Sequence, residues 1–276
     1  MDIEGGNEHE YDDVTLPDPV DLETWFDDVG APTKILDFLS SDAFPLSASF
    51  AGAGGRSVGA VSHASVLDLG TGNGSSLLTL RLQGSYHGYM VGVDYSPQSI
   101  ELARKLSKQY SNPRCTSELS VELPDAEYAC DKMRFEVLDL LEDHPRKQRW
   151  WPSAAESSSP ELDGFDLVLD KGTFDAISLS SDTIDIGGKI VRVHEAVPRI
   201  VISLIRPRGF FLITSCNWTE EEVVRWFTTG EGVAGELEVF DKISYPVFEF
   251  GGHKGQGAAS VCFRRRAPDT SIMSMA

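Results

Sequence analysis

The chain has 276 residues, of which 41% are hydrophobic, and a formal net charge of −19. This length is sufficient for one large α/β domain with a substantial buried core. The excess of negative charge repels phosphate backbones, so the composition argues against direct binding of nucleic acid and favours a basic protein partner.

The acidic residues are concentrated at the start of the chain. Residues 1–33 contain 11 acidic residues and no Lys or Arg, which predicts an acidic and partly disordered segment. The main domain is predicted over residues 34–266, with a short tail at 267–276. Residues 34–39 have apolar positions at helical spacing.

Repeated strand and helix patterns follow. Strands are predicted at 65–69, 89–94, 134–138, 165–169 and 209–214, with helices at 75–82, 97–110, 190–205 and 219–227. The last two strands, 237–247 and 258–264, are connected through a turn at 251–255. Polar stretches at 111–132 and 142–163 are predicted to be flexible insertions. This order predicts a seven-stranded, Rossmann-like α/β sheet that is parallel except for an antiparallel strand from the terminal hairpin, with helices on both faces.

The four cysteines are far apart in the sequence. They form no C-x-x-C pair and no Cys/His cluster with metal-ligand spacing, so no metal site is predicted. Unpaired thiols are typical of a reducing compartment. No apolar run reaches about 18 residues, and the N-terminus lacks signal-peptide features. We therefore expect a cytoplasmic protein without a membrane span, and a monomer.

Residues 65–74 read Ser-Val-Leu-Asp-Leu-Gly-Thr-Gly-Asn-Gly and combine a buried strand with a glycine turn before a helix. Glycines at alternate positions allow positive φ and close approach of a ligand to the backbone. A carboxylate at Asp68 favours a cofactor with an amino group and a sulfonium over a pyrophosphate. An NAD-dependent oxidoreductase is further disfavoured because Ser75 stands where the dinucleotide pattern requires glycine.

The spacing D-x-G-x-G-x-G resembles the first motif of class I methyltransferases, which use S-adenosylmethionine. The resemblance implies that the turn binds this cofactor through Asp68, Gly70, Thr71, Gly72 and Asn73.

Acids at the ends of the next strands extend the predicted site. Asp94 lies 22 residues after Gly72, where a carboxylate can accept both ribose hydroxyl hydrogens, and Tyr95 follows it. In the methyltransferase pattern, Asp139 contacts the adenine amino group and Leu140 packs on the ring. For each of these acids, an ordinary turn or capping role is the alternative.

The segment after the fourth strand reads Asp-Lys-Gly-Thr-Phe-Asp-Ala-Ile-Ser-Leu, from Asp170 to Leu179. Together with 67–74, 93–97, 209–219 and 248–252, it resembles the elongation factor 1-alpha lysine methyltransferase 2 family. The resemblance covers about 65–264, except the two insertions, and implies protein-lysine methylation with translation elongation factor 1-alpha as the protein substrate. In this family an additional N-terminal segment covers the cofactor, and only Trp25-Phe26 match its end.

Topology brings Asp170 and Asn217 to the same edge of the sheet, as candidates for orienting the reacting amine. Phe174, Trp218 and Trp25 are candidates for lining the lysine channel. Packing in the core is the alternative for each aromatic residue. Two other functions remain open: a small-molecule methyltransferase with the same cofactor site, and a non-catalytic scaffold that binds the cofactor.

Overall fold

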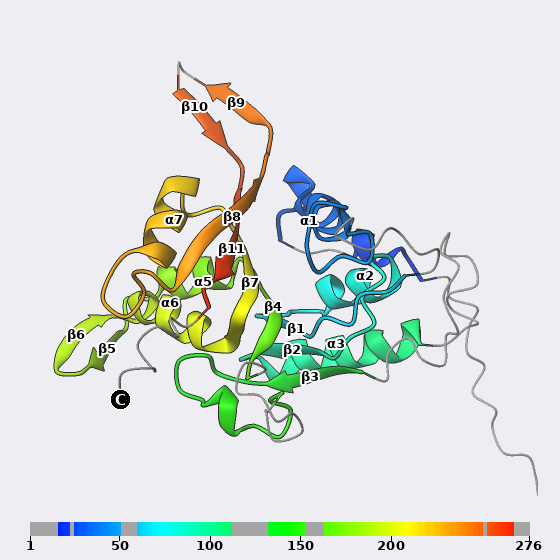
Figure 1. The fold of residues 1–276 in the computed structure, drawn as a ribbon, viewed down its shortest axis with the longest axis horizontal. Coiled ribbons are helices and arrows are strands. Elements are labelled where there is room, and N and C mark those ends of the chain that lie inside the picture. Colours follow the sequence, from blue (N-terminus) through cyan, green and yellow to red (C-terminus); the bar gives the residue numbers. More distant parts are fainter. Residues whose placement is uncertain are drawn as a thin grey trace, which may run out of the picture.

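A seven-stranded sheet forms the centre of the computed structural model, which describes residues 16–22, 25–50, 60–111, 132–152, 163–250 and 253–267 (Figure 1). Its strands are β1 (Val66–Leu69), β2 (Met90–Asp94), β3 (Met133–Val137), β4 (Phe165–Lys171), β7 (Ile205–Ser215), β8 (Leu237–Ile243) and β11 (Ala259–Arg265). They lie in the order β3-β2-β1-β4-β7-β11-β8. In this sheet β11 alone runs opposite to the other strands, and it lies between β7 and the edge strand β8. The predicted fold class is confirmed.

Helices cover both faces of the sheet. Figure 1 shows α1 (Ala31–Ser40), α2 (Ser75–Leu82) and α3 (Pro97–Tyr110) on one face, and α5 (Thr173–Leu179), α6 (Val193–Leu204) and α7 (Glu220–Thr228) on the other. The alternation of side chains along β7 supplies both cores. Phe210 and Leu212 pack towards the first helix group, whereas Phe211 and Ile213 pack towards the second.

Two helices begin where their sequences predict. Ser96 caps α3, because its hydroxyl accepts a hydrogen bond from the Ser99 backbone N–H at 3.2 Å, and Pro97 occupies the first turn. Thr219 and Glu222, spaced as Thr-x-x-Glu, form a capping box at the start of α7.

The region between β4 and β7 differs from the prediction. The sequence predicts one helix over 190–205, but α6 begins only at Val193 and ends at Leu204. The structure adds α5 and a hairpin of β5 (Thr183–Ile186) and β6 (Lys189–Arg192). The hairpin turn uses Gly187 and Gly188, both at positive φ. Short elements of four to seven residues carry too little periodicity to be recognised reliably from sequence.

Two other connections complete the sheet. Between β3 and β4, the described residues 138–152 contain the 3₁₀ turn η4 (Pro145–Lys147) and no α-helix. The predicted strand over 237–247 ends at Ile243. A separate ribbon of β9 (Val247–Phe250) and β10 (His253–Gln256) projects from the sheet beyond β8 and β11 (Figure 1).

Parts of the segments predicted as disordered or flexible are packed. In the 142–163 insertion, Trp150 and Trp151 are buried near Phe165, and the Trp151 indole N–H donates to Asp163 at 2.7 Å. In the N-terminal segment, the carbonyl of Pro17 accepts a hydrogen bond from the Tyr110 hydroxyl at 2.6 Å.

The remaining parts of these segments lie outside the described residues: 1–15, 23–24, 112–131, 153–162 and 268–276. Among the helices of the described ranges, none is long and apolar enough to cross a membrane.

Candidate active site

The glycine turn between β1 and α2 leaves open space beside its backbone. Gly70, Gly72 and Gly74 all have positive φ, of 62°, 56° and 81°. A Cβ on Gly72 would meet no atom within 4 Å, whereas one on Gly70 would lie 2.0 Å from the Thr173 hydroxyl oxygen. Gly70 therefore allows the turn to pack against the start of α5, and Gly72 gives a ligand direct access to the main chain.

Asp68 is buried at the end of β1, with 3% of its surface exposed. It accepts a hydrogen bond from the Thr71 hydroxyl at 2.7 Å, so the turn holds the carboxylate in place. Burial raises the pKa of Asp68 to about 6, although the Thr71 hydrogen bond and the charge of Lys171 oppose that rise. A positively charged ligand group at this carboxylate would stabilise its ionised form.

Asp94 connects the ends of β1 and β2. One of its oxygens accepts the Gly72 N–H at 3.0 Å, and the other accepts the Ser96 N–H at 2.9 Å. A carboxylate oxygen has two acceptor positions, so each retains one for a hydroxyl group. Tyr95, next to it, is 78% exposed. Asn73 accepts the Ser75 N–H at 3.1 Å and stabilises the start of α2.

Asp139 and Leu140 follow β3 at the same edge. The backbone N–H of Leu138 donates to the carbonyl of Asp94 at 2.9 Å, so this loop is attached directly to the end of β2. Asp139 accepts the Leu141 N–H at 2.9 Å, and Leu140 is partly buried against the core. The structure therefore brings the predicted cofactor residues from three strands to one edge of the sheet; their contacts with a cofactor stay a prediction.

Asp170 lies at the carboxyl edge of β4 and is almost completely buried, with 2% exposure. Its carboxylate accepts backbone N–H groups from Thr173 at 2.9 Å and from Phe174 at 3.1 Å, which stabilises the first turn of α5. Burial is the main cause that raises the pKa of Asp170 to about 8, with further contributions from Asp175 and Asp68. This carboxyl group therefore carries a proton for much of the time at neutral pH.

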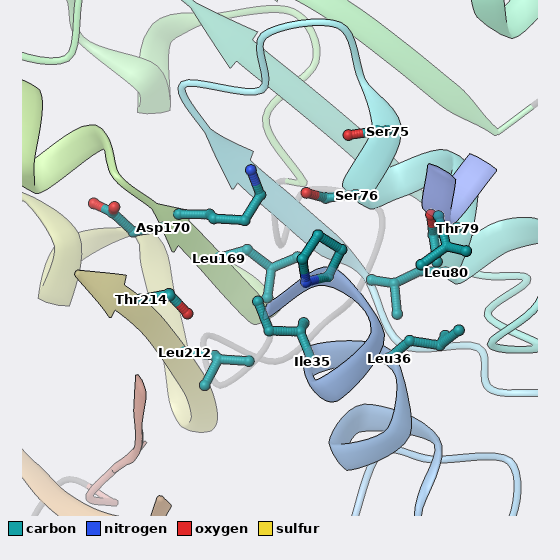
Figure 2. A pocket seen from close by; sticks show the side chains of 13 residues that line it. Ile35, Leu36, Ser75, Ser76, Thr79, Leu80, Leu169, Asp170, Leu212 and Thr214 are labelled. Carbon is teal, nitrogen blue, oxygen red and sulfur yellow. The ribbon is translucent and has the colours of Figure 1, made fainter. Parts of the chain in front are cut away.

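A small cavity lies beside Asp170, between α1, α2, β4 and β7 (Figure 2). Figure 2 shows Ile35 and Leu36 of α1 opposite Asp170, Leu212 and Thr214 of the sheet. Its volume of about 30 Å³ is too small for a nucleoside. We therefore expect the nucleoside of the cofactor to lie along the open edge beside Gly72.

The predicted acceptor residues are placed in two different environments. Asn217 is exposed in the loop after β7, whereas Phe174 is completely buried. The Trp218 ring stacks on Phe174 with a centroid distance of 5.8 Å and also contacts His194 and Trp226. The prediction that Phe174 lines a channel is wrong for this structure, because a residue with no exposed surface supports the interhelical core instead. Most of the contacts of Trp218 are in the same cluster.

Trp25 comes from the N-terminal segment and covers the loop after β4. Its ring is 57% exposed and lies against Gly172, where an added Cβ would be 2.6 Å from a ring carbon. Its neighbour Phe26 is buried and has the left-handed φ of 70°, which is uncommon for a bulky residue. Trp25 therefore offers an aromatic surface at the same edge as Asp170, as the substrate prediction requires.

Asp175 is not among the predicted site residues, although it closes the Asp-Lys-Gly-Thr-Phe-Asp segment. It is 1% exposed and binds the loop that carries Asn217. The available signal for a role of Asp175 in the sequence is an acid beside the apolar residues Phe174, Ala176 and Ile177. Among the described residues, no three His, Cys, Asp or Glu side chains lie together in an arrangement that holds a metal ion.

Comparison with known proteins identifies the chain's relatives. The family described as "Methyltransferase domain" matches residues 60–252. The chain belongs to this methyltransferase family. The predicted class of enzyme is confirmed, and with it S-adenosylmethionine as the cofactor. The glycine turn and Asp94 fit an adenosyl group. Among the described residues, none fills the space beside Gly72, and each oxygen of Asp94 retains an acceptor position for a ribose hydroxyl.

Among its relatives is the protein-lysine N-methyltransferase EFM4 of Saccharomyces cerevisiae, which is 33% identical over 243 residues, covering 87% of this chain and 82% of the relative. The human EEF1A lysine methyltransferase 2 is 31% identical over 202 residues, covering 73% of this chain and 66% of the relative. Among solved structures, the N-methyltransferase NodS from Bradyrhizobium japonicum aligns with a TM-score of 0.46 at 13% identity, covering 85% of each chain.

Replacing Asp94 with alanine tests the ribose assignment. We expect the Asp94→Ala variant to bind S-adenosylmethionine at least about tenfold more weakly in calorimetry, because a carboxylate that accepts two hydroxyl groups is lost. Asp241→Ala, which removes an exposed acid on β8, is the control and should bind normally. Unchanged affinity in Asp94→Ala would exclude the ribose role.

The raised pKa values predict how stability depends on pH. The folded state holds the Asp170 proton up to about pH 8, whereas the unfolded chain loses it near its ordinary value of 3.8. Between these values the folded state binds more protons, so Asp170 makes the protein less stable as pH rises. An Asp170→Asn variant keeps an acceptor for the two backbone N–H groups and cannot ionise.

The difference in free energy of unfolding between Asp170→Asn and the original protein should therefore increase in favour of the variant as pH rises towards 8. The increase should be up to about 1.4 kcal/mol per pH unit. The corresponding gain for Asp68→Asn should stop near pH 6. Denaturant titrations between pH 5 and 9 measure both differences. A difference that does not change with pH for Asp170→Asn would contradict the assignment.

Proposed function

We propose that this protein transfers a methyl group from S-adenosylmethionine to the ε-amine of a lysine in a protein substrate, and that the substrate is translation elongation factor 1-alpha. The observation that carries the proposal is the similarity, over most of the chain, to relatives named as protein-lysine methyltransferases. Three relatives, from human, zebrafish and mouse, are named for EEF1A.

The site has to provide the acceptor lysine in its neutral form. A lysine of pKa about 10.4 is neutral in about one of 2,500 molecules at pH 7, which costs roughly 4.6 kcal/mol. An ionised acid beside the amine would increase this cost. Burial keeps the Asp170 carboxyl largely protonated, with a pKa of about 8, so it does not oppose deprotonation of the lysine as an ionised acid would.

The residues of this chain then have distinct proposed roles. Asp94 and the turn at Gly72 hold the cofactor, which supplies a methyl group on a sulfonium. Asn217 and Trp25 are proposed to guide the lysine along the same edge, with the amide oxygen of Asn217 accepting a hydrogen bond from the amine. Asp170, whose carboxyl group also accepts backbone N–H groups at the start of α5, is proposed to contact the cofactor or the amine.

The net charge of −19 supports a basic protein surface as the substrate, since complementary charge accelerates association. A monomer in the cytoplasm is part of the same proposal. The cytoplasmic location is supported by Cys216 and Cys262, which are free thiols among the described residues.

Labelled S-adenosylmethionine tests the proposed activity directly. The protein is incubated with labelled cofactor and purified elongation factor 1-alpha, and the product is digested and analysed by mass spectrometry. We expect label on a lysine of the factor, and a loss of at least tenfold in the initial rate for Asp94→Ala when the cofactor is below its saturating concentration.

A parallel reaction with cell lysate identifies other acceptors. Label in a different protein would contradict the proposed target but retain lysine methylation. Label only in small molecules would favour a small-molecule methyltransferase, and cofactor binding without any transfer would favour a scaffold.

A further inference from the structure

A buried acid holds the loop that follows β7. The carboxylate of Asp175, on α5, accepts hydrogen bonds from the Ser215 hydroxyl and from the Cys216 backbone N–H, the latter at 2.8 Å. The Cys216 thiol lies 3.5 Å from the same carboxylate oxygen. Residue 175 therefore contacts this loop through several hydrogen bonds, although only 1% of its surface is exposed.

The contacts continue along the loop. The backbone carbonyl of Asp175 accepts the Asn217 side-chain N–H at 3.4 Å, and the Ser215 hydroxyl accepts the Trp218 backbone N–H at 3.1 Å. Each residue from Ser215 to Trp218 is thus connected to Asp175 directly or through Ser215. The side-chain nitrogen of Asn217 therefore faces α5, and its oxygen lies 3.8 Å from the Cys216 thiol, so both ends of the amide group have a partner within the same network.

The loop occupies the acceptor side of the site. β4 and β7 are parallel neighbours, with Lys171 paired with Thr214, so the residues after Thr214 emerge beside Gly172 at the carboxyl edge. Cys216 and Asn217 are exposed there, whereas Asp175 and Ser215 are buried beneath them. The buried pair therefore acts on an exposed loop at the edge where the predicted cofactor residues lie.

Burying a carboxylate is costly unless strong hydrogen bonds compensate for the loss of water. Asp175 accepts such bonds from the loop rather than from its own helix, so its charge stabilises one conformation of residues 215–218. An asparagine at this position could accept at only one side-chain atom, and its NH₂ group would face the Cys216 N–H or the Ser215 hydroxyl.

We propose that Asp175 is a positioning residue for methyl transfer, which sets the loop at 215–218 so that the Asn217 amide oxygen faces the incoming lysine amine. This inference rests on the proposed lysine methyltransferase function and extends it to a residue that does not touch the substrate. Asp175 should therefore affect the rate of methyl transfer and leave the affinity for S-adenosylmethionine unchanged.

The test compares Asp175→Asn with Asp166→Asn. Asp166 is a matched control, because it is also a buried acid and accepts hydrogen bonds from the Ser65 N–H and hydroxyl, at 2.8 and 2.7 Å. It lies at the opposite end of β4, where it pairs with Arg206. Both variants are expected to lower thermal stability, so stability alone does not distinguish them.

The kinetic readout separates the two variants. In Asp175→Asn we expect kcat for the protein substrate to fall at least tenfold, while the Kd for S-adenosylmethionine stays within twofold. Asp166→Asn should keep kcat within twofold. The proposal is overturned if kcat in Asp175→Asn is unchanged, or if its kcat and cofactor affinity fall together.

A second readout does not require methyl transfer. Partial burial raises the pKa of the Cys216 thiol, and the nearby charges of Asp175 and Asp28 raise it further. Removing the Asp175 charge should therefore accelerate alkylation of Cys216 several-fold at pH 8, measured on the Cys216 peptide by mass spectrometry, whereas Asp166→Asn should have no effect. An unchanged alkylation rate in Asp175→Asn would contradict the control of this loop by Asp175, even if the original protein methylates no tested substrate.

Discussion

Carboxylates buried at one edge of a parallel sheet are the feature on which the site depends. The ends of parallel strands and the starts of helices both leave backbone N–H groups without partners. Asp94 accepts such groups after β1 and β2, and Asp170 accepts them at the start of α5. These contacts determine the geometry of the turns. Burial at the same edge of the sheet raises the pKa of Asp170 and of Asp68. Structure and binding chemistry therefore depend on the same few acids.

The two halves of the site are constructed differently. The cofactor half consists mainly of main chain, with glycines at positive φ and a carboxylate that retains acceptor positions for hydroxyl groups. The acceptor half is an exposed loop that Asp175 holds from beneath, with Trp25 nearby on Gly172. Because Asp175 bonds to the acceptor loop and Asp94 to the glycine turn, we expect the transfer rate to change without loss of cofactor affinity when Asp175 is replaced. This separation is the physical basis of the role inferred for Asp175.

Local patterns were sufficient for the part of the fold that carries the cofactor motif. The strand at 66–69, the three glycines and the acid at Asp94 are close in sequence or separated by a regular strand–helix spacing, so their placement could be predicted. The caps at Ser96 and Thr219 were also predictable, because a capping residue acts on N–H groups only two or three positions away. Their short range makes these signals visible in one sequence.

Features that arise from long-range packing were not predictable in the same way. Phe174 was expected at a channel, but Trp218, Trp226 and His194 from other elements enclose it. Trp150 and Trp151 lie in a polar stretch and nevertheless pack near Phe165. Asp175 gains its role from a loop about 40 positions later in the chain. In each case the partners are distant in sequence, so no local pattern indicates them.

The central claim is that the acids at the carboxyl edge form the cofactor site. A crystal structure of the protein with S-adenosylhomocysteine tests this most directly, because the ligand keeps the ribose and the amino group of the cofactor. We predict that both ribose hydroxyls donate to Asp94 and that the amino group of the ligand lies on the Asp68 side of the Gly72 turn. A ligand bound at another edge of the sheet, or a ribose without contact to Asp94, would contradict it.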